Sequence, residues 1–456
     1  MVFNSNIFLF VFLPITFALF WLARDKTQRY VLLALSGFVF YGWWDWRFCG
    51  LLLFSALFSY AAGLAIERFP VQAKRLAYFS VSVDLAILGV FKYYSFFVRS
   101  AKDVLPGFPL PLLEITLPIG ISFYTFHTIS YVLDVYAKRV RAATNIFEYI
   151  TYVNLFSQLV AGPIVRFRQI EDDLAHIDGP LKPDMLVKGV SYFTIGMIKK
   201  VIIADQIAQY LNPVLQDAGM LSTAGAWTAA FGYSLQLYFD FSGYSDMAVG
   251  LGALFGLNIP INFAAPYRAT GIADFWRRWH ISLSSWLRDY LYIGLGGNRH
   301  GEWKTYRNLM LTMLLGGLWH GANWTFIVWG AYHGLLLSLE KFFQAPISRV
   351  PVFVRQVATY LLVVIGWVPF RAESLDAALG WLHRMFVPAA MPATRDVPMA
   401  LTAWVAAALL LAATVPETHE IRVPPARRWA FASGFALFVC YLFINNGKSV
   451  FLYYQF

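Results

Sequence analysis

The amino-acid sequence predicts an all-α polytopic membrane protein. Its 456 residues are 59% hydrophobic and only 14% charged, whereas soluble domains carry about 25% charged residues. The mean hydropathy is +0.55. Apolar runs of about twenty residues recur from one end of the chain to the other. A run of that length crosses a hydrocarbon core of about 30 Å as a helix.

The charge and the cysteines narrow the class of protein further. The net charge is +10, but no basic run alternates with aromatic residues in a polar context, so we exclude nucleic acid as a partner. Cytoplasmic loops rich in Lys and Arg account for the excess. The two cysteines, Cys49 and Cys440, lie in apolar surroundings far apart in the sequence. This pattern predicts two buried, inert thiols and neither a disulfide framework nor a zinc site.

The N-terminal part of the chain predicts five spans, at residues 7–21, 30–44, 48–66, 76–98 and 117–136. Pro106, Pro109 and Pro111 argue against helix between the fourth and the fifth span. No basic segment precedes the first run and no small-residue cleavage site follows it. We therefore expect the first run to be an uncleaved span and not a signal peptide.

The distribution of basic residues predicts the orientation. Basic clusters at 24–29, 68–75 and 138–141 follow the first, third and fifth predicted spans. Because cytoplasmic loops are enriched in Lys and Arg, we expect these three loops in the cytoplasm and the N-terminus in the periplasm.

Two segments in the middle of the chain are apolar but carry charged residues. Residues 186–207 hold three lysines and one aspartate, so we expect them inside the protein or partly at the interface. Residues 224–257 contain the insert DFSGYSDMA (240–248), which holds Asp240 and Asp246 and has glycines on either side. Irregular backbone at membrane depth is tolerated only inside protein or beside a cavity. We therefore expect the insert to be irregular and to line a cavity.

The remaining predicted spans include 353–370, 400–414 and 429–443. Run lengths give about eleven transmembrane helices in total, together with shorter re-entrant or interfacial helices. The sequence shows no fixed-period repeat, and we expect one integral membrane domain that covers residues 1–456.

The stretch from 273 to 340 carries the candidate chemistry. His320 lies in an apolar run between Trp319 and Gly321, and an ionisable residue at membrane depth is a candidate functional residue. The neighbouring glycines leave room for another group. Burial favours the neutral imidazole, which a general base requires. The alternative is a histidine that binds the backbone of a neighbouring helix.

The segment FWRRWH (275–280) places His280 beside Arg277 and Arg278 and between aromatic residues. One helix with an aromatic side and arginines elsewhere is typical of a membrane interface. His280 is therefore a functional candidate, with an aromatic-belt anchor as the alternative. The glycine-rich GLGGNRHG (294–301) lacks the phosphate-loop signature, which favours a tight turn. We expect Arg288 and Asp289 to form a structural ion pair in a region of low dielectric constant.

A third histidine, His333, follows His320 by thirteen positions. On an unbroken helix that separation is about 20 Å and nearly the opposite face. We therefore expect a packing role for His333 and no zinc triad, since HExxH and cysteine ligands are also lacking. No GxSxG elbow is present, which excludes a serine hydrolase of that type.

Three long strings resemble the membrane-bound O-acyltransferase family in the same order: DFSGYSDMAVGLG, PINFAAPYRATGIADFWRRWHISLSSWLRDYLYIGLGGNR and LLGGLWHGANWTFIVWGAYHG. The bacterial branch typified by alginate O-acetyltransferase is the most similar, and the D-alanyl transfer protein of teichoic acid assembly is more distant. The resemblance implies helices around a central tunnel in a bacterial inner membrane. It implies no bound cofactor but a cytoplasmic acyl thioester, with acetyl-CoA expected, as co-substrate. The acceptor would be a hydroxyl of an exported polysaccharide or of a periplasmic relay partner.

The resemblance also implies the roles of the site residues, in a catalytic core at about 225–345. The family's near-invariant histidine corresponds to His320, as general base, and its second polar position to His280, which would orient the donor or stabilise the oxyanion. The tunnel residues that we expect are Trp279, Arg277, Arg278, Asp289, Arg299, Trp319, Asn323, Asp240 and Asp246. Among them, the arginines would lie at the cytoplasmic mouth, and Trp319 and Asn323 beside His320.

Two rival functions remain at this point. A secondary transporter or flippase also has broken helices and intramembrane charge, but should show paired inverted halves, which we do not find. A non-catalytic subunit of a polysaccharide export machine is the other alternative.

Overall fold

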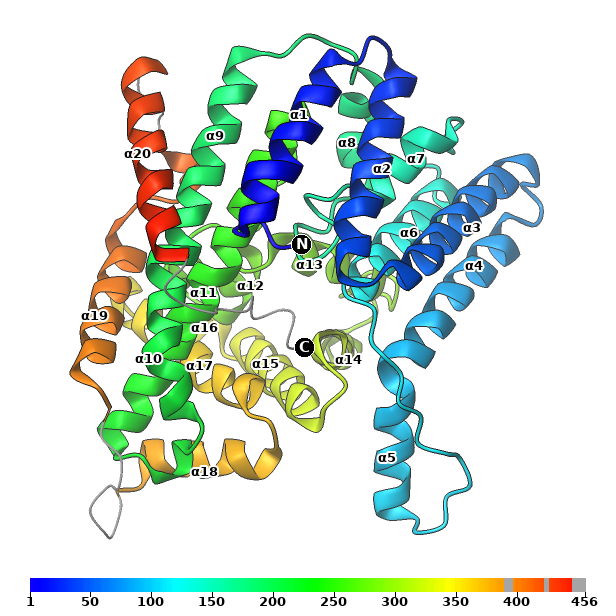
Figure 1. Cartoon of the computed structure of the whole chain (residues 1–456). Helices are drawn as coiled ribbons and strands as arrows, with labels where there is room; N and C mark the ends of the chain where they lie inside the picture. Colours follow the sequence, from blue (N-terminus) through cyan, green and yellow to red (C-terminus); the bar gives the residue numbers. More distant parts are fainter. Residues whose placement is uncertain (389–396, 422–425, 445–456) are drawn as a thin grey trace. The chain divides into compact units, whose positions relative to one another are not determined.

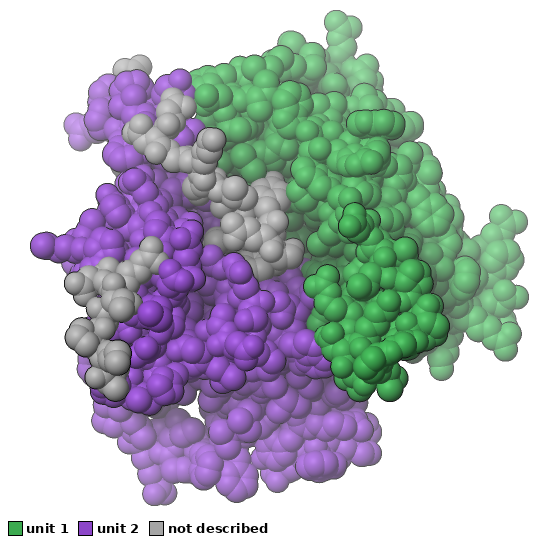
Figure 2. Space-filling model, turned by 60° about the horizontal axis from the view of Figure 1, so that its bottom comes forward, with its two compact units in different colours: residues 1–193, 244–260 green, residues 194–243, 261–456 purple. Residues whose placement is uncertain are grey.

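The computed structural model describes residues 1–388, 397–421 and 426–444, and they are largely helical without a β-strand. This confirms the predicted all-α class. The chain forms two compact units (Figure 2). The first comprises Met1–Phe193 and Tyr244–Pro260, and the second comprises Thr194–Gly243 and Ile261–Phe456. The expected single domain stays a prediction.

The first unit contains the N-terminal helices (Figure 1), which are η1 (Phe8–Phe12), α1 (Leu13–Leu22), α2 (Lys26–Asp45), η2 (Trp46–Phe48), α3 (Cys49–Arg68), α4 (Ala73–Leu88), η3 (Gly89–Tyr93), α5 (Tyr94–Val104), α6 (Ile121–Tyr136), α7 (Ile146–Asn154) and α8 (Phe167–Ala175). Helices α3, α4 and α6 pack side by side. Gly63 on α3 permits this approach, because a Cβ there would lie 2.5 Å from the hydroxyl oxygen of Tyr131 on α6.

Local sequence signals set several helix ends in this unit. Helix α6 begins directly after Gly120, whose φ is +74°, a backbone conformation that glycine adopts without strain. The proline-containing residues that precede it form no helix, as predicted.

Arg29, from the first basic cluster, is buried and donates to the carbonyl oxygens of Ile177 and Gly179 at 2.6 and 2.8 Å. That charge therefore fastens a loop and does not face solvent.

The second unit contains most of the remaining elements, which are η4 (Ile198–Ala204), α10 (Asp205–Leu215), η5 (Ala218–Met220), η6 (Pro266–Arg268), α12 (Ile272–Arg278), α13 (Ile281–Trp286), η7 (Leu287–Tyr292), α14 (Glu302–His320), α15 (Trp324–Phe342), α16 (Gln344–Ser348), α17 (Val352–Arg371), α18 (Leu375–Phe386), α19 (Met399–Thr414), η8 (Thr418–Glu420) and α20 (Ala426–Ile444). Helices α9 (Pro183–Met197) and α11 (Thr223–Leu254) contribute residues to both units.

The expected irregular insert at 240–248 is wrong, because these residues belong to the continuous helix α11. Its glycines allow close packing and do not interrupt the helix. A Cβ at Gly243 would lie 2.8 Å from the carbonyl oxygen of Gly196 on α9. The polar 186–207 segment is partly buried, as expected, and Lys200 is 2% exposed. Its ammonium group pairs with Asp240 at 2.5 Å and with Asp205 at 2.7 Å.

Helices α14 and α15 form an antiparallel hairpin, because the chain turns at Gly321–Asn323. Asn323 caps α15 by accepting from the backbone N–H of Thr325 at 3.1 Å. The helix backbones approach closely at Gly330 and Gly334, where added Cβ atoms would clash with Met313 and Met310 of α14. This spacing of two glycines, four positions apart, is a common device for close helix packing in membranes.

Three helical stretches among the described residues are long and apolar enough to cross a membrane, namely Lys26–Arg68, Ala73–Val104 and Val352–Arg371. Shorter apolar helices cover Phe8–Leu22, Met399–Thr414 and Arg428–Ile444. The structure thus supports a helical membrane protein, while the number of about eleven spans stays a prediction.

Candidate active site

His320 is the last residue of α14 and is 5% exposed. Its ring contacts the rings of Trp319, Trp329 and Phe370, with centroid separations of 5.0, 5.2 and 5.1 Å. The turn at Gly321 ends the helix directly after the imidazole. His320 therefore lies at a helix end with aromatic rings around it, and not on the face of a continuous span.

His280 lies between two short helices, α12 and α13, and is fully buried. The single helix that we expected across this segment is wrong, because the backbone of His280 adopts φ +44° and ψ +55°. A non-glycine residue rarely adopts this left-handed conformation, which costs on the order of 1–3 kcal/mol and is found most often at functional sites. The ring of His280 contacts Phe241 at 4.7 Å and Trp319 at 6.1 Å.

Trp319 therefore contacts both histidine rings, and it is 5% exposed. The second unit thus gathers His280 and His320 around one indole, from elements about forty residues apart in the sequence. The ring of His280 also contacts Phe241, which belongs to the DFSG string of α11.

Asn262 binds His280 and was not predicted from the sequence. Its side-chain oxygen lies 3.2 Å from Nδ1 of His280 and accepts from the backbone N–H of Ser282 at 3.1 Å and from the Ser282 hydroxyl at 2.9 Å. Asn262 is 2% exposed. The only signal in the sequence is an amide side chain within the otherwise apolar string IPINFAAP.

His333 is fully buried in an aromatic cluster. Its ring lies 5.2 Å from Trp276 and 5.0 Å from Trp329, the same indole that contacts His320. The helix is broken between His320 and His333, so the separation of about 20 Å for an unbroken helix does not apply. The hairpin folds α15 back along α14. Trp279 is buried beside this cluster, and its ring lies 4.9 Å from Trp367.

The arginines of the site are more exposed than the histidines. The side chain of Arg277 is 70% exposed and that of Arg278 is 37% exposed, and both pair with Asp274, at 3.7 and 3.0 Å. Arg299 is exposed on the turn at 294–301, which the glycine-rich sequence predicted.

Asp289 forms the expected ion pair with Arg288 at 2.7 Å. The side chain of Arg288 is 62% exposed and that of Asp289 is 17% exposed, and the expected setting of low dielectric constant stays a prediction.

Three of the remaining expected tunnel residues have identifiable positions. Asp240 is 1% exposed and pairs with Lys200. Asn323 caps α15 and donates to the backbone carbonyl of Glu373 at 3.0 Å. Asp246 belongs to the first unit. The contacts of Asp240 and Asn323 described here are therefore with a lysine and with backbone groups, and not with a histidine ring.

Glu340, near the end of α15, caps the helix that leads to His280. Its carboxylate accepts from the backbone N–H groups of Ile272 and Ala273 at the start of α12. Gly271 makes this possible, since a Cβ there would lie 2.6 Å from a carboxylate oxygen of Glu340. The contact spans 68 residues of sequence, and no periodicity reveals it.

Replacing Glu340 by alanine should lower the free energy of unfolding by about 1–3 kcal/mol, because two partly buried backbone N–H groups would lose their acceptor. Thermal unfolding of the purified protein in nanodiscs measures this. Glu340→Gln is the matched control, since its amide oxygen can still accept, and it should recover most of the loss. Equal melting of the alanine variant and the wild type would contradict the role.

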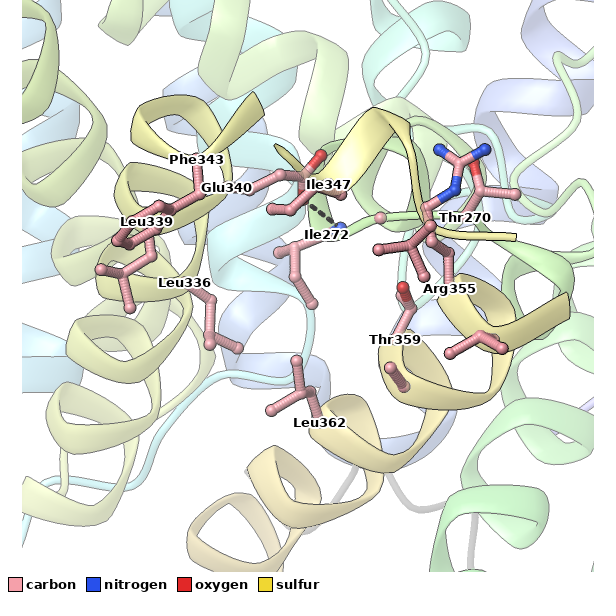
Figure 3. A pocket seen from close by; sticks show the side chains of 14 residues that line it. Thr270, Ile272, Leu336, Leu339, Glu340, Phe343, Ile347, Arg355, Thr359 and Leu362 are labelled. Carbon is pink, nitrogen blue, oxygen red and sulfur yellow. Dashed lines mark hydrogen bonds between the residues drawn. The ribbon is translucent and has the colours of Figure 1, made fainter. Parts of the chain in front are cut away.

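An apolar pocket of about 320 Å³ lies beside this contact, between α15 and α17 (Figure 3). Leu336, Leu339 and Leu362 line it. Ile272 and Glu340, which share a hydrogen bond, also line it. None of the predicted site residues lines this pocket. Among the described residues, no group of three or more His, Cys, Asp or Glu side chains could hold a metal ion.

Known proteins are similar to this chain over most of its length. Residues 38–370 match the membrane-bound O-acyltransferase (MBOAT) family. A protein of Azotobacter vinelandii named "Probable alginate O-acetylase AlgI" is 46% identical over 434 residues, which cover 92% of this chain and 85% of the relative. A peptidoglycan O-acetyltransferase of Helicobacter pylori is 36% identical, with 84% and 80% covered. A teichoic acid D-alanyltransferase of Bacillus subtilis is 29% identical, with 56% and 69% covered.

The match to the family includes both buried histidines and the indole that they share. The resemblance noted in the sequence is confirmed, and the chain belongs to the membrane-bound O-acyltransferase family as an O-acyltransferase.

Proposed function

We propose that this enzyme moves an acetyl group from acetyl-CoA, bound from the cytoplasm, to a hydroxyl of an exported polysaccharide or of a periplasmic relay partner. The names of two relatives, an alginate O-acetylase and a peptidoglycan O-acetyltransferase, support acetyl transfer to a polysaccharide. The observation that carries the proposal is the pair of buried histidines around Trp319.

In the proposed reaction, neutral His320 accepts the proton of the acceptor hydroxyl. The oxygen of that hydroxyl attacks the thioester carbonyl at the same time. The new C–O bond forms and the C–S bond of the tetrahedral intermediate breaks. The proton held by His320 then passes to the departing thiolate. His280 orients the donor or stabilises the oxyanion, within a catalytic core at about 225–345.

The proposed tunnel brings the two substrates to this pair from opposite sides of the membrane. Arg277, Arg278 and Arg299 would lie at its cytoplasmic mouth, where their exposed charges would attract the phosphates of the donor. The other proposed tunnel residues are Trp279, Asp289, Trp319, Asn323, Asp240 and Asp246.

Purified protein in nanodiscs, supplied with acetyl-CoA labelled in the acetyl group, tests the proposal. We expect release or transfer of the label in proportion to the amount of enzyme, with alginate as the first acceptor probe. A protein that binds the polysaccharide but never cleaves the thioester, with or without the acceptor, would refute the donor proposed here.

We also propose that the protein lies in a bacterial inner membrane with a periplasmic N-terminus. In intact cells, a cysteine replacing Arg139 should resist a membrane-impermeant maleimide, because its loop would be cytoplasmic. Glu114→Cys, on the exposed segment before α6, is the control and should react. Both native cysteines are free and are first replaced by serine. Labelling at position 139 with protection at 114 would reverse the orientation.

A further inference from the structure

We infer that Asn262 is a positioning residue that holds neutral His280 with its proton on Nδ1, so that Nε2 carries the lone pair. This inference rests on the proposed function only for its catalytic consequence. It assigns His280 the role of a hydrogen-bond acceptor toward an O–H or N–H group of a bound substrate.

The position of the amide oxygen of Asn262 determines the tautomer. The oxygen and nitrogen of an amide side chain are commonly assigned from their hydrogen-bond partners. Here the backbone N–H of Ser282 points at the assigned oxygen from 3.1 Å, and a backbone N–H can only donate. An amide NH₂ group in that place would face another donor. The atom beside Ser282 N is therefore the oxygen.

The same oxygen lies 3.2 Å from Nδ1 of His280. Since an amide oxygen only accepts, Nδ1 must carry the hydrogen. In a neutral imidazole one nitrogen donates and the other accepts, so Nε2 holds the lone pair. The Ser282 hydroxyl lies 3.5 Å from Nδ1 while it donates to Asn262 at 2.9 Å, so its oxygen can also accept from Nδ1.

Backbone contacts hold Asn262 in place without its side chain. The N–H of Ile281 donates to the carbonyl oxygen of Asn262 at 2.9 Å, and the N–H of Ala264 donates to that of Arg278 at 3.0 Å. These bonds lie on either side of His280, whose backbone is in the left-handed conformation. A change in the Asn262 side chain should therefore leave the segments 262–264 and 278–281 bonded through their backbones. It should remove only the hydrogen bond that holds the imidazole.

The tautomer distinguishes between the two roles proposed for His280. Stabilising an oxyanion requires a donor aimed at the developing charge, and neutral His280 has no hydrogen on Nε2. It can instead accept a hydrogen bond from a substrate and orient it. The oxyanion must then be stabilised by a different donor.

Ring ¹⁵N spectra of the protein in nanodiscs, labelled in histidine, test the tautomer without any assay of activity. The signals of His280 are those lost in His280→Gln. We expect a protonated Nδ1 and an unprotonated Nε2 at neutral pH in the wild type, and a changed ratio in Asn262→Ala. A protonated Nε2 with an unprotonated Nδ1 in the wild type would overturn the inference.

Kinetics with acetyl-CoA as the probe donor test the catalytic consequence. Asn262→Ala should lower kcat about 10-fold to 100-fold, as partners that orient a histidine typically do, with little change in KM. Asn262→Asp keeps an acceptor oxygen and should recover most of the activity. Ser285→Ala, which removes a hydroxyl of helix α13 that donates to a backbone carbonyl, is the control, with activity near that of the wild type.

The double variant His280→Ala, Asn262→Ala should lose no more activity than His280→Ala alone, because residues that act as one unit are non-additive. An Asp variant as inactive as the alanine variant, or losses that multiply, would overturn the positioning role. If His280→Ala retained full activity, the proposed function of His280 would fail, whereas the ring spectra would still decide the tautomer.

Discussion

Replacement of His320 by alanine should abolish acetyl transfer. A general base contributes about 10²-fold to 10⁴-fold to the rate, and His320 is the buried imidazole that we propose for this role. The measurement is the O-acetyl content of product per mole of enzyme, with acetyl-CoA as donor. Activity of the alanine variant above roughly a tenth of the wild type would lie outside that range and contradict the assignment.

His320→Phe is the matched control for loss of packing. The histidine ring contacts three aromatic rings, so alanine removes these contacts together with the base. Phenylalanine keeps a ring of similar position but cannot accept a proton. We expect it to fold and melt nearly as the wild type does while remaining inactive. An active phenylalanine variant would show that the ring acts by packing alone.

Replacement of Gly330 by leucine should disrupt the α14–α15 hairpin. Even a Cβ at this position would clash with the backbone carbonyl of Met313, and backbone cannot rotate away as a side chain can. Overpacking costs typically 1–3 kcal/mol, and sometimes more. We therefore expect a lower thermal midpoint and loss of activity, because Trp329, one residue before Gly330, contacts His320.

Gly380 on α18 provides the control for the general cost of replacing a helical glycine. No atom lies within 4 Å of a Cβ added there. Alanine at 380 should leave the midpoint unchanged or raise it slightly, since glycine is a poor helix former. Alanine at 330 should lower it. Similar midpoints for the two alanine variants would argue against close packing of α14 and α15.

The parts of the fold that the sequence predicted depend on local signals. Helices α2, α3 and α17 follow from apolar runs with charged ends, and α6 starts where Gly120 follows a proline-rich segment. The turn at Gly321–Asn323 also had a local signal, namely a capping asparagine after a glycine. The uniform hydropathy of the run obscured it.

The candidate site was only partly predictable, for a physical reason. A lone imidazole in an apolar run is visible in the sequence at His320, and the aromatic and basic string FWRRWH marks His280, so both were identified. Nothing local breaks the helix at His280, however, and its left-handed backbone depends on contacts with Asn262, eighteen residues earlier. The contact of Glu340 with α12 and the ion pair of Lys200 with Asp240 likewise join residues far apart in the sequence, so no local pattern reveals them.

The hairpin of α14 and α15 also determines how membrane topology should be mapped in this chain. Because its arms run in opposite directions, we expect residues 301 and 343 on the same side of the membrane. Reporter enzymes fused after either position should give the same signal. The whole stretch would then add an even number of crossings, and a hydropathy count that takes it as one span would reverse the side assigned to every later span.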